Sequence, residues 1–93
     1  MQYDYPAIFK PAEEGGYLVQ FYDSENWFTE GDTLDEAVFM AEDVLNLMLL
    51  CYEEEGLMIP APTPIDQVVI KENEIVKMIH ADTERYAKML NND

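Results

Sequence analysis

The sequence predicts an α+β fold in which helices cover one face of a small sheet, a two-layer sandwich with the element order β-β-β-α-β-α. Two observations lead to this prediction. Short aromatic and β-branched segments separated by turn residues fill the N-terminal third of the chain, which is typical of strands. The longest apolar stretch, residues 34–52, repeats its apolar side chains every three to four positions, the spacing of a helix that packs on a sheet. We expect residues 1–93 to form a single domain.

The first two strands are expected at residues 5–9, "YPAIF", and residues 17–22, "YLVQFY". Between them, Gly15 and Gly16 can adopt the positive φ angles of a tight turn, so the two segments predict a β-hairpin. Pro6 has no N–H to donate to a neighbouring strand. We therefore expect Pro6 to begin the first strand or to lie partly at a sheet edge.

A short third strand, "WFT", begins at Trp27, the only tryptophan. Its indole is expected either to pin the next helix to the sheet or to stand at a contact surface. Thr33 followed by Glu36 is the capping-box pattern, in which each side chain bonds the other residue's exposed amide. A phosphate-binding loop would need free amides and usually a lysine, yet no basic residue lies between Lys10 and Lys71. We interpret this turn as a helix cap.

The second half of the predicted helix is apolar beyond a single stripe. Either later chain covers this second side, or another protomer does. An oligomer interface would contain Phe39, Met40, Leu47 and Leu50. Gly56 is the expected C-cap. The three glutamates before it oppose the helix dipole, and the predicted fold offers no reason for them.

The segment "IPAPTP" predicts an extended connector that crosses the molecule. The fourth strand is expected at residues 74–81, "EIVKMIHA", and Asp82 can cap the short helix "TERYAKML". Because a helix precedes this strand, we expect it to pair parallel to a strand of the meander.

Charge is the most unusual bulk property, because 20 acidic residues against 5 lysines and arginines give a net charge of −15. Phosphates would be repelled, so direct binding of nucleic acid is not expected, whereas a basic protein would be attracted. The acids could also serve only to keep a small protein soluble. No apolar run approaches the roughly 18 residues of a membrane span, and no export signal is evident. We expect a cytoplasmic protein that does not contact membranes.

Catalysis is not expected. The interiors of the first two strands carry no acid, so the converging carboxylates of a two-metal nuclease are missing. His80 lies in an apolar strand, where a structural or rim position is favoured over a general base. One cysteine, Cys51, and one histidine cannot form a structural zinc site without several carboxylates. We therefore predict a protein that is no enzyme, with no catalytic residues, no metal and no cofactor.

Several spacings match one known pattern at once. The stretches are "YPAIFKPAEEGGYLVQFYD", "FTEGDTLDEAVFMAEDVLNLML", "EEEGLMIPAPTP" and "EIVKMIHAD". Together they resemble the HicB antitoxin family over nearly the whole chain. The resemblance implies a partly degraded ribonuclease H-like sandwich. It also implies an antitoxin that neutralises a HicA-like toxin, a small basic RNA-cleaving protein, by covering its catalytic and RNA-binding surface.

The toxin contacts are expected around the third strand, at Asp23, Glu25, Trp27, Glu30 and Asp32. The family often has Pro-Gly where this chain has Glu25 and Asn26, so the loop before that strand is expected to differ in shape. Too few residues follow the last strand for a separate DNA-binding domain, and operator binding by this chain alone is not expected. A homo-oligomer is also predicted. The alternatives are an oligomeric structural domain without a toxin and a vestigial metal-dependent nuclease.

Overall fold

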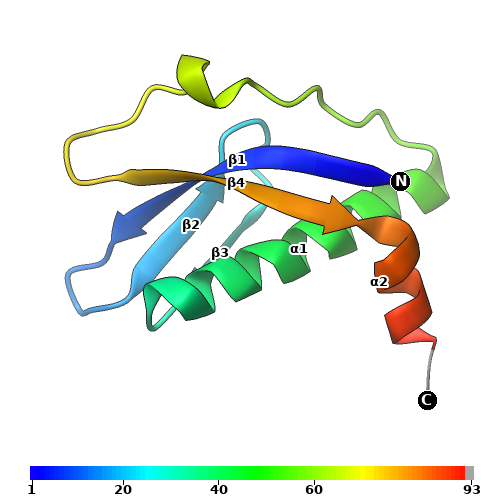
Figure 1. Ribbon diagram of the computed structural model, residues 1–93, viewed down its shortest axis with the longest axis horizontal. Helices are drawn as coiled ribbons and strands as arrows, with labels where there is room; N and C mark the ends of the chain where they lie inside the picture. The colour runs from blue at the N-terminus through cyan, green and yellow to red at the C-terminus, as the bar shows by residue number, and fades with distance from the viewer. Residues whose placement is uncertain (92–93) are drawn as a thin grey trace.

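The computed structural model describes residues 1–91 and contains one antiparallel four-stranded sheet with a long helix on one face (Figure 1). The strand order is β3-β2-β1-β4. The elements are β1 (Gln2–Pro11), β2 (Tyr17–Phe21), β3 (Phe28–Gly31), α1 (Leu34–Glu55), the 3₁₀ turn η1 (Ile65–Gln67), β4 (Ile75–Asp82) and α2 (Thr83–Leu90). The predicted α+β sandwich and its element order are confirmed.

The hairpin β1–β2 turns at Gly15 and Gly16, whose φ angles are 99° and 78°. Of the two alternatives for Pro6, the first is wrong, because β1 begins at Gln2. The second is confirmed, because β1 pairs with β2 only over residues 7–11, so β1 is partly at an edge on its β2 side from Pro6 back to its start. The Pro6 carbonyl accepts from the Tyr22 amide at 3.1 Å, just beyond the last β1–β2 pair. The N–H and C=O of a strand residue point toward the same neighbouring strand. The N–H that Pro6 lacks would therefore have pointed toward β2, at the position where the β1–β2 hydrogen bonds end.

The fourth strand runs antiparallel to β1, with Ile79 opposite Tyr5, which corrects the expected parallel pairing. The reason is the segment between α1 and β4. The helix carries the chain along the sheet once, and the connector carries it back before β4 begins (Figure 1). Two traverses reverse the strand direction that one helical crossover would have given.

The core lies between α1 and the sheet. Alternate residues of β1 point toward the helix, and α1 presents a buried stripe to them. The buried apolar residues are Tyr5, Ala7, Phe9, Val19, Phe21, Trp27, Ala37, Ala41, Leu45, Leu49, Ile79 and Ala81. At Gly31 a Cβ atom would lie 2.5 Å from the Ala37 nitrogen. The missing side chain at Gly31 therefore lets the first turn of α1 rest directly on β3.

The predicted capping residues are in place, and of the expected capping box at Thr33 the structure of residues 1–91 contains the half made by the threonine hydroxyl. The Thr33 hydroxyl accepts from the Glu36 amide at 3.1 Å, and Gly56 has the left-handed φ of 67° at the C-cap. The Asp82 carboxylate accepts from the Arg85 amide at 3.2 Å, so Asp82 is the N-cap of α2. The turn before α1 is therefore a helix cap, because the Thr33 side chain occupies one of the free amides of the first turn.

Glu53, in the last turn of α1, has a structural role that the sequence did not reveal. Its carboxylate accepts from the Tyr3 hydroxyl at 2.6 Å and from the Thr83 hydroxyl at 2.8 Å. One glutamate thus joins the ends of β1, α1 and α2. This corrects the expectation that no glutamate near the helix end has a reason in the fold.

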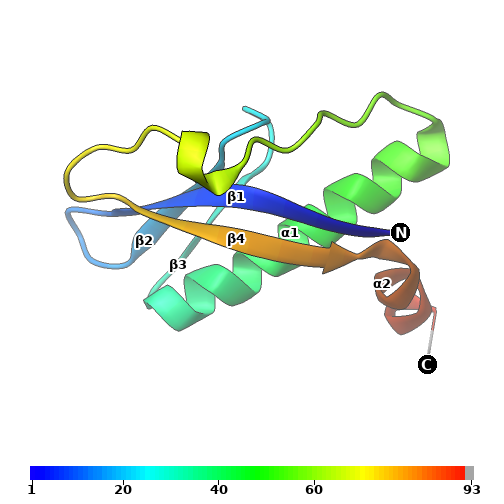
Figure 2. The ribbon, with the colours of Figure 1, turned by 45° about the horizontal axis from the view of Figure 1, so that its top comes forward.

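The connector crosses the molecule as predicted, on the side of β1 and β4 away from α1 (Figures 1 and 2). The Tyr5 hydroxyl donates to the Pro60 carbonyl. Farther along, Asp23 in the β2–β3 loop accepts from the Thr63 amide at 2.9 Å and also from the Thr63 hydroxyl. These contacts fasten the connector to the sheet and to the β2–β3 loop.

Candidate functional site

Trp27, one of the expected toxin contacts, lies in the core with no exposed surface. Its ring packs edge-on against Tyr5 at 5.4 Å and Tyr52 at 5.5 Å between ring centroids. Tyr52 belongs to α1, so the indole pins the helix to the sheet, the first of its two expected roles. A buried ring offers no surface to a partner, which corrects the expectation of a direct contact there.

Asp23, another expected contact, is half-buried and occupied by the chain itself. Both of its carboxylate oxygens accept from Thr63. Burial, and then the nearby Asp23 charge, raises the pKa of Tyr5. Asp23 therefore orders the β2–β3 loop and the connector, and it can affect a partner only through their shape.

The other three expected residues, Glu25, Glu30 and Asp32, are exposed. They lie on or beside β3, which is an edge strand of the sheet. Phe28, on the same strand, leaves 63% of its surface exposed. The expected acids thus lie on or next to the strand that carries an exposed aromatic side chain, which the sequence analysis did not select.

Strand register brings a second apolar side chain to this place. Leu18 pairs with Glu30 and Gln20 pairs with Phe28, so their side chains share the sheet face that α1 leaves uncovered. Leu18 is 49% exposed. A cavity of about 310 Å³ opens here between Leu18, Phe28 and Ile8 of β1. We call the exposed residues of this region the β3 surface: Leu18, Glu25, Phe28, Glu30 and Asp32.

The strand register identifies Phe28 as an outward-facing residue. Thr29 and Gly31 lie on the helix-covered face, opposite Val19 and Tyr17 in register. The residues that alternate with them, Phe28 and Glu30, must therefore face outward. The β3 surface combines two exposed apolar side chains with three exposed carboxylates, and Lys10 also lines the cavity beside them. Apolar anchors with polar neighbours are typical of protein interfaces.

The four residues expected at an oligomer interface lie on the outer part of α1. Phe39 and Leu47 are exposed, whereas Met40 and Leu50 are half-buried. The helix α2 packs against α1 and covers part of its second side. Later chain therefore supplies some of the covering, and an interface with a second copy stays a prediction.

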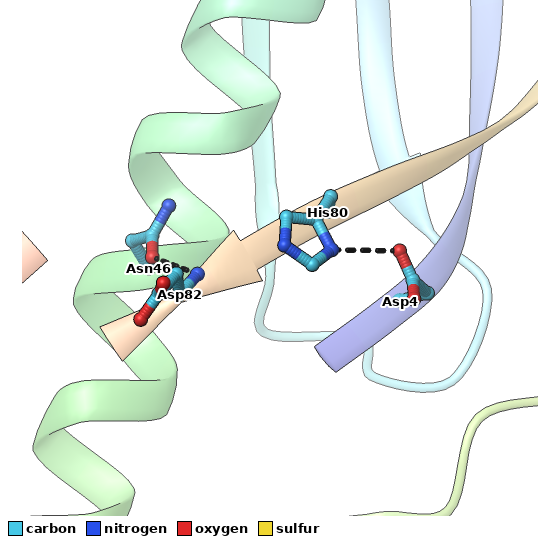
Figure 3. A network of polar contacts seen from close by, with 4 residues as sticks. All are labelled: Asp4, Asn46, His80 and Asp82. Atoms are coloured by element: carbon cyan, nitrogen blue, oxygen red, sulfur yellow. Dashed lines mark hydrogen bonds and ion pairs between the residues drawn. The ribbon is translucent and has the colours of Figure 1, made fainter. Parts of the chain in front are cut away.

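His80 lies on β4, and its Nδ1 is 3.0 Å from a carboxylate oxygen of Asp4 on β1 (Figure 3). Both side chains are more than half exposed, so neither is desolvated as a general base usually is. Among residues 1–91, no three histidine, cysteine, aspartate or glutamate side chains are grouped to hold a metal ion. Within that same part of the chain, no helix is long and apolar enough to cross a membrane.

Comparison with known proteins gives the family. A model of the HicB-like antitoxins of bacterial toxin–antitoxin systems matches residues 4–77. The chain belongs to this family.

Two relatives are antitoxins by name. The chain is 44% identical over 63 residues to antitoxin HicB 1 of Photorhabdus laumondii, a match that covers 68% of this chain and 41% of that protein. It is 40% identical over 62 residues to antitoxin HicB of Escherichia coli K12, covering 67% of this chain and 45% of that protein. The chain therefore spans less than half the length of these curated relatives.

Solved structures share the fold. One is a toxin–antitoxin complex from Streptococcus pneumoniae, with a TM-score of 0.83 and 22% identity over 92% of this chain and 73% of that one. A second is the HicA3 and HicB3 toxin–antitoxin complex, with a TM-score of 0.69 and 21% identity over 86% of this chain and 99% of that one. A third, antitoxin HicB3, has a TM-score of 0.68 and 26% identity over 90% of this chain and 65% of that one.

Proposed function

We propose that this chain is an antitoxin module that binds a small basic HicA-type toxin and covers its catalytic and RNA-binding surface. The observation that carries this is membership of the HicB-like antitoxin family over residues 4–77. The net charge of −15 supports it, because a strongly acidic domain can occupy the basic surface that RNA would use. The chain acts by occlusion and breaks no bond of its own.

The β3 surface is the proposed toxin contact. Its carboxylates, Glu25, Glu30 and Asp32, are exposed and would accelerate encounter with a basic partner. Phe28 and Leu18 supply apolar area that a partner can desolvate, and such anchors carry most of the affinity in protein interfaces. We therefore expect the acids to control mainly the rate of toxin association. We expect Phe28 and Leu18 to control mainly the rate of dissociation.

The direct experiment uses a small basic protein of the HicA type, sought first among the genes that neighbour the gene of this chain. Purified together at low salt, the two proteins should form a stable complex, and the complex should no longer cleave RNA. The association rate should fall as salt is added, since screening weakens steering. If the toxin still cleaves RNA at saturating amounts of this chain, the proposal is wrong.

A matched pair of charge reversals tests the surface. Glu30→Lys with Asp32→Lys should slow toxin association by about tenfold and flatten its salt dependence. Glu13→Lys with Glu14→Lys makes the same charge change on exposed residues of the β1–β2 turn and should slow association less. Phe28→Ala should instead speed dissociation. Equal effects from both charge pairs, with no effect of Phe28→Ala, would place the contact elsewhere.

A second copy of the chain is another proposed partner, because Phe39 and Leu47 are exposed on α1. A homodimer through α1 would bury both side chains. Light scattering of the isolated chain measures this directly. A monomer at all accessible concentrations would contradict the proposed homo-oligomer and leave toxin binding unaffected.

A further inference from the structure

A cavity of about 290 Å³ opens between α1, the end of β4 and α2. Phe39, Glu42 and Asp43 line it from α1, and Tyr86 and Met89 line it from α2. The three α1 residues share one helix face because they are spaced by three and four positions. We call this cavity the α1–α2 groove. It lies by β4, and the β3 surface is at the opposite edge of the sheet.

The walls of the groove are held in place. The Asn46 side chain donates to the Glu42 carbonyl at 2.9 Å, and its oxygen accepts from the Asp82 amide at 3.0 Å (Figure 3). Tyr86 donates to the Asp43 carboxylate at 3.2 Å. These contacts tie α1 to the end of β4 and to α2. A preformed groove loses less entropy when it binds a side chain than a groove that must first be ordered.

The groove is acidic as well as aromatic. Carboxylates of Glu42, Asp43 and Asp82 line it, against the single guanidinium of Arg85. His80 also borders the groove, and its ring nitrogen contacts Asp4. Within residues 1–91, Glu42 takes part in no ion pair. A cation entering the groove would therefore find a carboxylate free to receive it.

Phe39 has no evident role in the fold. Its side chain is 65% exposed, on a helix whose opposite face supplies the core. An exposed phenylalanine and a tyrosine beside carboxylates suit a guanidinium, which stacks on aromatic rings while it donates to carboxylates. A lysine ammonium is compact and strongly hydrated, and it gains less from such flat walls.

We propose that the α1–α2 groove binds an arginine side chain of a basic protein partner. The net charge of −15 favours a basic partner over a second copy of this chain. At Phe39 this proposal is therefore an alternative to the homodimer described above, since one side chain cannot be covered by both partners. The proposal goes beyond the proposed function, because it does not require that the partner be a toxin. A partner that also contacted the β3 surface would have to reach both edges of the sheet.

The first test uses a defined probe, N-acetyl-arginine amide, added to the isotope-labelled chain and followed by nuclear magnetic resonance. We expect saturable shifts concentrated at the rings of Phe39 and Tyr86. The neutral isostere N-acetyl-citrulline amide should cause no saturable shift there. Equal shifts from the two compounds, or arginine-induced shifts spread evenly over all exposed acids, would overturn the proposal.

Variants of exposed residues complete the test, since they leave the core intact. Glu42→Gln should weaken arginine binding about two- to fivefold, and Phe39→Ala should have an effect of similar size. The matched controls, Glu13→Gln and Tyr22→Ala, change exposed residues outside both the groove and the β3 surface and should leave arginine binding unchanged. Binding equally weakened by the controls would contradict the groove. So would a homodimer that Phe39→Ala dissociates, since a second copy would then fill it.

Discussion

The carboxylate of Glu53 accepts a 2.8 Å hydrogen bond from the hydroxyl of Thr83, and Thr83 has no exposed surface. The two residues belong to the end of α1 and the start of α2, and Tyr3 of β1 donates to the same carboxylate. An acid at a helix C-terminus opposes the dipole by roughly 0.3–1 kcal/mol. Each hydrogen bond to a charged group returns about 1.5–3 kcal/mol, so the contacts outweigh the dipole.

Replacing Glu53 by alanine should lower the free energy of unfolding by about 2–3 kcal/mol. The Tyr3 hydroxyl loses its acceptor, and the Thr83 hydroxyl keeps only the Met1 carbonyl, which lies 3.3 Å away. Urea unfolding measures the change. The control is Glu54→Ala, an exposed neighbour in the same helix turn. The Glu54→Ala substitution removes only the unfavourable interaction with the helix dipole. The free energy of unfolding should therefore stay the same or rise slightly. Equal destabilisation by both variants would contradict the role of Glu53.

The same network predicts a pH dependence. Burial, reinforced by the hydrogen bond to Glu53, raises the pKa of Tyr3 from 10.0 to about 12. Because the folded pKa is higher than the unfolded one, the stabilisation is complete below pH 10 and is lost as the pH rises toward 12. Tyr3→Phe should reduce this alkaline loss of stability, measured by thermal unfolding across that range. Tyr22→Phe, at an exposed tyrosine, should retain it.

The connector should loosen when Asp23 is replaced. Asp23→Ala removes the acceptor for both the amide and the hydroxyl of Thr63. The Thr63 amide should then exchange with solvent at least about tenfold faster, which corresponds to a local loss of 1.4 kcal/mol. Hydrogen exchange followed by nuclear magnetic resonance measures this. Glu25→Ala, in the same loop, should leave Thr63 protected; unchanged exchange in Asp23→Ala would mean that other contacts hold the connector.

Adding one methyl group at Gly31 should be costly. Its Cβ would lie 2.5 Å from the nitrogen and 2.7 Å from the Cα of Ala37. These are backbone atoms, so α1 must shift, and we expect Gly31→Ala to destabilise the fold by about 1–3 kcal/mol or more. Gly56→Ala meets nothing within 4 Å and suffers only its left-handed φ, about 1–2 kcal/mol. Thermal unfolding compares the two, and intact stability of Gly31→Ala would contradict the close packing.

The candidate site was predictable in part. The acids near β3 follow from composition and strand order, and Glu25, Glu30 and Asp32 are exposed as a contact requires. The aromatic anchor was not found, because Trp27 and Phe28 are adjacent and only the pairing register decides which one faces α1. One position along a strand turns a side chain from the core to the solvent.

The sequence by itself determined which elements this protein has, the turn of its hairpin and the caps of its helices, whereas most strand ends differ by one to three residues from those expected. The glycine turn of the hairpin and the caps at Thr33, Gly56 and Asp82 depend on backbone groups a few residues away, so local spacing was enough to predict them. Only the tertiary structure decided the direction of β4 and the partners of Glu53. The direction of β4 and the hydrogen bonds of Glu53 depend on which segments, far apart in the chain, come into contact. Those contacts are set by the packing of the whole core.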